Sequence, residues 1–198
     1  WVVVTVDRFS RRVIGTAVFA KQPSAHDVTA FLGHAVRSAG TAPRHLVTDH
    51  GRQFAARAFR RWCRRRGIQQ RFGTIGKYGS IAVVKRFIRS MKHECTRRIL
   101  VPFRQETLQR ELDAYVSWFN ADRPHEHCGG ATPDEIYYRL RPAARRPRFE
   151  PRECWPRRSP CARPHALVRG QPGAVVGLVV DHRDRREHLP VVTLRRVA

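Results

Sequence analysis

Short β-branched runs alternate with longer segments of helical periodicity over most of this chain, and this order limits the folds available to it. Val2 to Val6 is apolar and β-branched, which predicts a buried strand. Residues 7–10 are typical of a turn, and residues 12–19 are expected to form the returning strand of a hairpin. A helix follows, with Ser24 as its cap and Gly40 at its end.

The predicted alternation of strands and helices continues beyond Gly40. Further strands are predicted at 45–48 and 68–72, and helices at 55–66, about 80–98, about 105–120 and 133–140. Two strands followed by alternating helices and strands predict an α/β layer fold, in which residues at the carboxyl ends of strands often carry function.

The last third of the chain differs in composition. Residues 142–165 interleave proline with arginine, which predicts a stiff, basic linker. Residues 166–198 are expected to form a small β appendage with strands at 174–180 and 189–197, which packs on the main domain or takes a third strand from Ala166 to Val168. The expected domains are therefore 1–141, the linker 142–165 and the appendage 166–198.

The charge balance favours a polyanionic partner. The chain has 39 Lys and Arg against 16 Asp and Glu, a net charge of +23. Nucleic acid is the first candidate, although only four of the 39 are lysine, and codon usage in a GC-rich genome also produces arginine. Five cysteines without a disulfide framework and the absence of a long apolar run predict a reduced, cytoplasmic protein, nucleoid-associated if prokaryotic, with no membrane partner.

Two motifs stand at a defined distance from one another. Asp49 lies at the end of the predicted strand 45–48, in the sequence Thr-Asp-His-Gly, and 35 residues separate it from Lys85. Lys85 follows Gly-Ser-Ile-Ala-Val-Val at the start of a predicted helix. Four more motifs occur in order along the chain: Val6-Asp7-Arg8-Phe9-Ser10-Arg11, Trp118-Phe119-Asn120, Arg123-Pro124-His125 and Gly130-Ala131-Thr132-Pro133.

Together these motifs resemble the D,D(35)E integrase catalytic core of insertion-sequence transposases, which are related to retroviral integrases. The resemblance covers about residues 1 to 140. It implies a ribonuclease-H-like fold, a five-stranded mixed sheet with helices on both sides. It also implies DNA integration or transposition by metal-dependent phosphoryl transfer, in which three acids hold two Mg²⁺ or Mn²⁺ ions.

The chain departs from this family pattern at two of the three acids. Asp7 matches the family's Asp-x-x-Ser-Arg turn, and only 41 residues separate it from Asp49. We therefore expect Asp7 to cap backbone N–H groups or pair with Arg11. The first acid and the first strand are expected to lie before residue 1.

Lys85 occupies the position of the third acid. An ammonium group donates hydrogen bonds and accepts none, so it cannot replace a carboxylate as a metal ligand. Asp49 would remain as the second acid and a weak, residual metal ligand, and the family's Mg²⁺ or Mn²⁺ is not expected to bind productively. Glu94 lies nine residues further on, half a helical turn out of phase with Lys85, and is not expected to substitute. Lys85 either faces solvent or DNA, or pairs with Asp49.

DNA binding can persist without catalysis. Arg86, Arg89 and Lys92 lie on the same predicted helix as Lys85 and are candidate phosphate contacts. Three functions remain open: a catalytically defective integrase core; a non-catalytic module that binds DNA or dimerises, with itself or with an intact transposase that it modulates; and an active nuclease that uses an unrecognised acid.

Overall fold

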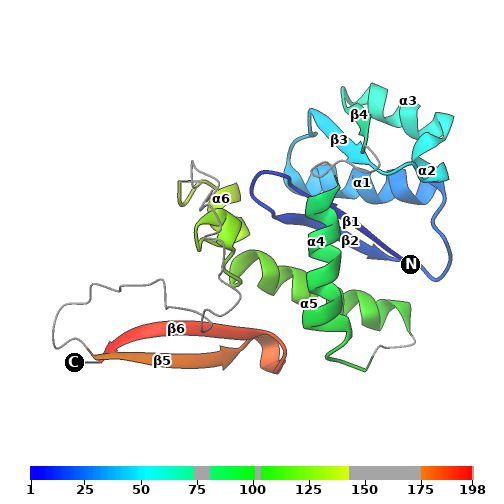
Figure 1. The fold of residues 1–198 in the computed structure, drawn as a ribbon. Coiled ribbons are helices and arrows are strands. Elements are labelled where there is room, and N and C mark those ends of the chain that lie inside the picture. Colours follow the sequence, from blue (N-terminus) through cyan, green and yellow to red (C-terminus); the bar gives the residue numbers. More distant parts are fainter. Residues whose placement is uncertain (74–80, 101–103, 143–174, 198) are drawn as a thin grey trace, which may run out of the picture.

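The computed structural model describes residues 1–73, 81–100, 104–142 and 175–197 of the chain (Figure 1). Its strands are β1 (Val2–Val6), β2 (Val13–Val18), β3 (His45–Thr48), β4 (Gln69–Phe72), β5 (Val175–His182) and β6 (Pro190–Val197). Its α-helices are α1 (Ala25–Ala39), α2 (Arg52–Ala55), α3 (Arg57–Arg65), α4 (Ala82–Met91), α5 (Gln105–Ala121) and α6 (Pro133–Tyr137). A π-helical turn, η1 (Lys92–Thr96), and two 3-10 turns, η2 (Glu126–Cys128) and η3 (Arg183–Arg185), complete the set.

The predicted N-terminal hairpin is confirmed. β1 and β2 pair antiparallel, with Val2 opposite Val18. In the turn between them, a carboxylate oxygen of Asp7 accepts hydrogen bonds from the backbone N–H of Ser10 at 2.8 Å and from its hydroxyl at 2.7 Å. Ser10 is fully buried. Asp7 is therefore a turn residue, as its motif predicts.

A second layer combines α1, α2 and α3 with the parallel pair β3–β4. Ser24 and Asp27 form a reciprocal capping box at the start of α1, and Gly40 ends it in the left-handed conformation, with φ 71°. The helix predicted at 55–66 is wrong at its start. Two helices stand there instead, because Ala56 is extended (φ −62°, ψ 142°) and breaks the helical path.

The helices after β4 also depart from their predicted lengths. The helix predicted at about 80–98 is α-helical only to Met91 and continues as the π-helical turn η1, where the N–H of Arg97 donates to the carbonyl of Lys92 at 3.0 Å. The helix predicted at 133–140 ends at Tyr137, because Arg139 adopts a positive φ of 60°.

Helix α5 supplies side-chain partners along the outer edge of β2. The Asn120 amide accepts from the N–H of Val13 and donates to its carbonyl, each at 2.9 Å. Near the start of α5, Gln109 accepts from the N–H of Val18 at 2.8 Å, and Gln105 donates to the Val18 carbonyl at 2.9 Å. These amides occupy the hydrogen-bonding positions that a neighbouring strand would fill.

The C-terminal hairpin β5–β6 packs against the same helix (Figure 1). Leu189 is fully buried in the core that includes Leu112 and Tyr115 of α5. The Trp118 indole donates to the carbonyl of Pro190 at 2.8 Å, and Arg186 forms a bidentate pair with Glu111, both bonds at 3.0 Å. The expectation that the appendage packs on the main domain is confirmed. The proposed third strand, Ala166 to Val168, lies outside the described residues, as does the linker.

The five-stranded sheet is not formed by the described residues. Their strands make three two-stranded sheets, β1–β2, β3–β4 and β5–β6. Within these residues, β1 pairs only with β2 and β3 only with β4. The structure therefore confirms a mixed helix-and-strand fold. The five-stranded sheet stays a prediction, because the strand that would join β1 to β3 is not among the described elements.

We expect Asn120→Leu to lower the free energy of unfolding by about 3 kcal/mol, because two buried backbone groups of Val13 lose their partners. Urea unfolding of both proteins measures the difference. Arg110→Ala, an exposed site on the same helix, is the control and should change stability by less than about 0.5 kcal/mol. A loss below about 1 kcal/mol for Asn120→Leu would contradict the role given to the amide.

Candidate nucleic-acid interface

The Asp49 side chain is fixed by the turn that follows β3. Its Oδ1 accepts a hydrogen bond from the N–H of Gly51 at 2.9 Å, and the residue as a whole is exposed. A Cβ at position 51 would lie 2.9 Å from this oxygen and 2.6 Å from the end of the Gln53 side chain, so a larger residue there would displace the Asp49 or Gln53 side chain. The Thr-Asp-His-Gly motif thus presents one carboxylate at the carboxyl end of a strand.

Lys85 lies on the first turn of α4, where its N–H donates to the carbonyl of Ile81 at 3.0 Å. Its side chain is exposed. Both Lys85 and Asp49 belong to the described residues, and neither a hydrogen bond nor an ion pair joins them there. Of the two roles expected for Lys85, the structure therefore matches the solvent-facing cation and not the pair with Asp49.

The donor groups do not fit the pair of divalent ions that the resemblance implies. In the described parts of the chain, no group of three or more His, Cys, Asp or Glu side chains is placed to hold a metal ion. Divalent magnesium needs several hard oxygen ligands, and Asp49 offers one carboxylate while Lys85 offers no acceptor. No step of a metal-assisted reaction can be derived from this set.

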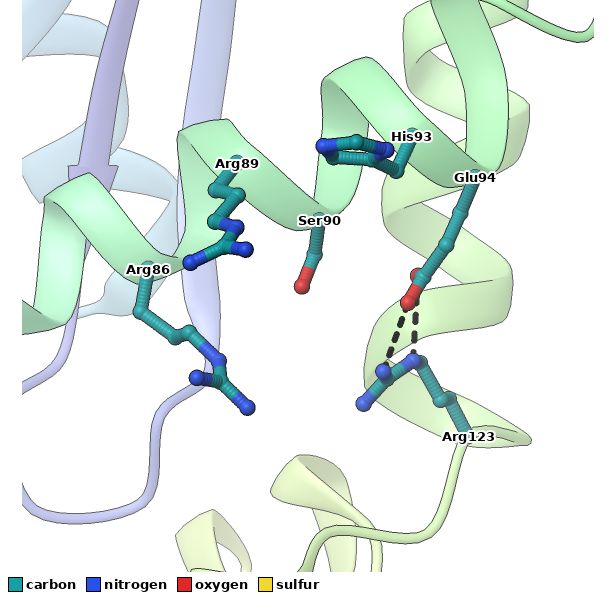
Figure 2. Close-up of a pocket in the computed structure, with 6 residues that line it drawn as sticks. All are labelled: Arg86, Arg89, Ser90, His93, Glu94 and Arg123. Carbon is teal, nitrogen blue, oxygen red and sulfur yellow. Dashed lines mark hydrogen bonds and ion pairs between the residues drawn. The ribbon is translucent and has the colours of Figure 1, made fainter.

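Glu94 is committed to a structural network. Its Oε1 accepts from Nη2 of Arg123 at 2.6 Å, and its Oε2 accepts from Nε of Arg123 at 3.1 Å (Figure 2). The same Oε2 also accepts from the Tyr115 hydroxyl at 2.8 Å. Burial, with Glu94 next in effect, raises the pKa of Tyr115 far above its ordinary value, so the phenol remains a donor. The helical phase predicts that Glu94 points away from Lys85, and these partners on and after α5 agree with that prediction.

An open pocket of about 300 Å³ lies beside this network (Figure 2). Its lining consists of Arg86, Arg89, Ser90, His93, Glu94 and Arg123. The side chains of Arg86 and Arg123 extend toward the middle of the pocket from opposite sides. Three arginines face one glutamate, so the pocket keeps a surplus of positive charge even with Arg123 paired.

The structure divides the candidate DNA contacts between two surfaces. Arg86 and Arg89 line the pocket, whereas Lys92 is exposed on η1 outside the lining. Sequence reasoning did not find His93 and Arg123 as pocket residues. Arg123 follows a different helix, and only the fold brings it to α4.

The remaining motifs are packing elements. Trp118 and Phe119 belong to the main core, and Asn120 holds β2. The His125 ring packs edge-on against Phe119, with centroids 4.5 Å apart, and its Nε2 is buried without a hydrogen-bond partner among the described residues. Apart from Arg123, which lines the pocket, these motif residues therefore stabilise the fold.

Two family models match this chain, and both describe an integrase core domain. The first matches residues 1–77 and the second residues 66–133, so together they span two thirds of the 198 residues. This chain carries an integrase core domain. No curated protein matches the sequence.

Solved structures agree with this integrase core at the level of the fold. The catalytic core domain of BIV integrase is 24% identical, with a TM-score of 0.56 over 70% of this chain and 86% of that one. A chain of the simian T-cell lymphotropic virus intasome, solved in complex with PP2A regulatory subunit B56 gamma, is 22% identical, with a TM-score of 0.57 over 72% of this chain and 50% of that one.

The stability of this integrase core should fall in mild acid through His125. Burial, reinforced by the positive charge of Arg123, lowers the pKa of His125 to about 4. The unfolded chain, with a histidine pKa near 6.5, binds the proton more readily, so this stability is lost as the pH falls from about 6.5 toward 4. The loss from His125 should reach about 2 kcal/mol at pH 5.

Urea unfolding at pH 7 and pH 5 measures this loss. His125→Phe keeps the aromatic contact with Phe119. Its free energy of unfolding should differ less between the two pH values than that of the unaltered chain. Part of the change in unfolding free energy with pH should remain, because burial also lowers the pKa of His127 and His188. His45→Gln, at an exposed position, is the control and should keep the full slope. An unchanged slope in His125→Phe would contradict this assignment.

Proposed function

We propose that this integrase core binds DNA along the outer side of α4 and that the chain, as it stands, does not catalyse strand transfer. The observation that carries the proposal is Lys85, an exposed cation at the position where the family pattern places the third acid. The residues around it suit phosphate groups rather than divalent cations.

The charge distribution supports the DNA-binding part. The chain carries a net charge of +23, and Arg86 and Arg89 line an open pocket without an ion pair to any described residue. Guanidinium groups bind phosphate oxygens through paired N–H donors, and such contacts give affinity with little reading of base sequence. Lys85 and Lys92 add exposed cations on the same α4–η1 segment, outside the pocket lining.

The small number of metal ligands around Asp49 supports the second part of the proposal, that the chain does not catalyse strand transfer. The integrase core family is generally dependent on divalent metal ions, and when bound such ions generate the nucleophile and stabilise the leaving oxygen. Lys85 offers no oxygen ligand to a divalent cation, and Glu94 is occupied by Arg123 and Tyr115. In this proposal Asp49 remains as a second acid without its partners.

The unfilled edges of β1 and β3 support a further part of the proposal. Each pairs on one side only within the described residues, and one additional strand between them would complete the five-stranded sheet. We assign residues 1–141 to the core, 142–165 to a basic linker and 166–198 to an appendage whose hairpin packs on α5.

DNA affinity should depend steeply on salt and on the pocket arginines. In fluorescence anisotropy titrations, the double variant Arg86→Gln/Arg89→Gln should bind duplex DNA more weakly and reduce the slope of log K against log salt by about 2, about 1 for each lost phosphate contact. Arg37→Gln/Arg110→Gln removes the same charge at exposed positions on α1 and α5 and is the control. It should lose less affinity.

Two results would contradict this proposal. Binding that does not change between low and moderate salt would show that phosphate contacts do not supply the affinity. An equal loss in the control variant would show that net charge, rather than α4, determines the binding.

A further inference from the structure

Two exposed aromatic rings stack directly beside Asp49. The rings of His50 and Phe72 are nearly parallel, with centroids 4.9 Å apart and an interplanar angle of 14°. Phe72 is 40% exposed, and His50 is exposed as well. This aromatic pair is not part of the interface described above, which lies on α4.

The position of the pair follows from the parallel register of β3 and β4. Thr48 lies opposite Phe72, and the N–H of Gly73 donates to the Thr48 carbonyl at 2.8 Å. Phe72 is therefore held next to the end of β3, where Asp49 and His50 follow. Gln70 secures the same strand, because its amide donates to the Phe54 carbonyl at 3.0 Å. The two rings sit on a rigid edge of the fold, at the carboxyl ends of two strands.

Phe72 does not belong to the apolar core of its layer. The apolar cluster under this layer is built from Val28, Leu32, Phe59, Cys63 and Ile68, with Phe54 and Trp62 packed against it. Phe54 packs edge-on against Phe59, and Trp62 stacks on it. Phe72 takes no part in that cluster, and its ring contacts the imidazole of His50 instead.

We propose that the His50–Phe72 pair is a stacking platform for an unpaired nucleobase. A flat, parallel pair extends naturally to a third ring, and base–aromatic stacking adds affinity for single-stranded nucleic acid without requiring a particular base. The strongly basic chain supplies the attraction for the backbone. The inference rests on the proposed DNA binding and adds a preference for DNA with an unpaired end.

The test compares two DNAs that differ only at one end. One is a blunt duplex, and the other carries a short overhang with 2-aminopurine as its first unpaired base. The full chain should quench the 2-aminopurine fluorescence and bind the overhang DNA more tightly than the blunt duplex. Phe72→Ala should lose about tenfold in affinity for the overhang DNA and lose the quenching, while its affinity for the blunt duplex stays the same.

Three variants make the result specific to the aromatic face. Phe72→Leu keeps an apolar side chain and should lose the preference, and its unfolding midpoint shows whether the fold is intact. Phe72→Trp should retain the preference. Phe9→Ala, at a 68% exposed phenylalanine in the β1–β2 turn, is the matched control and should behave as the unaltered chain does.

The failure of the platform can be separated from the failure of DNA binding. Equal, salt-dependent affinity for both DNAs in the unaltered chain would overturn the platform and leave the proposed function standing. A Phe72→Ala variant that still prefers the overhang DNA would also overturn the platform. So would a Phe72→Ala variant in which only the oligomeric state changes. Failure to bind either DNA would overturn both.

Discussion

The side-chain amides of α5 along the edge of β2 are the constraint on which the rest of the structure depends. Asn120 satisfies both backbone groups of Val13, and Gln105 and Gln109 satisfy those near Val18. An edge strand that lacked these partners would be left with exposed hydrogen-bonding groups and a poorly defined register against the helix. Once α5 is fixed in this way, its other faces position the remaining elements.

Two of those faces determine what the candidate interface can do. Tyr115 and the residue after the helix, Arg123, hold Glu94, which removes the nearest carboxylate on the α4–η1 segment from any metal-binding role. Phe119 packs edge-on against Phe87 of α4, with centroids 4.9 Å apart, which sets the helix on the core. The cations of α4 are then left on the outer side, around a pocket with an excess of positive charge. A structural network and a positively charged surface thus share one helix.

Local sequence signals predicted the elements with well-defined ends. Ser24 and Gly40 bound α1, and the Asp7 turn formed as its motif indicates. The errors lie at helix ends that no local sequence signal marks: the break at Ala56, the π-helical turn after Met91 and the early end of α6. The sequence contains no local signal that Arg123 completes a pocket on α4 or that Phe72 stacks on His50, because strand register and helix packing bring these residues together.

Lys85 stands where the family pattern places the third acid, and we propose that this integrase core does not catalyse strand transfer. The most direct measurement is DNA cleavage and joining by the purified chain with Mg²⁺ or Mn²⁺. We predict no product above the protein-free level, both for the unaltered chain and for Asp49→Asn. Metal-dependent joining that Asp49→Asn abolishes would contradict the account, because it would show that Asp49 works with an acid that the structure does not reveal.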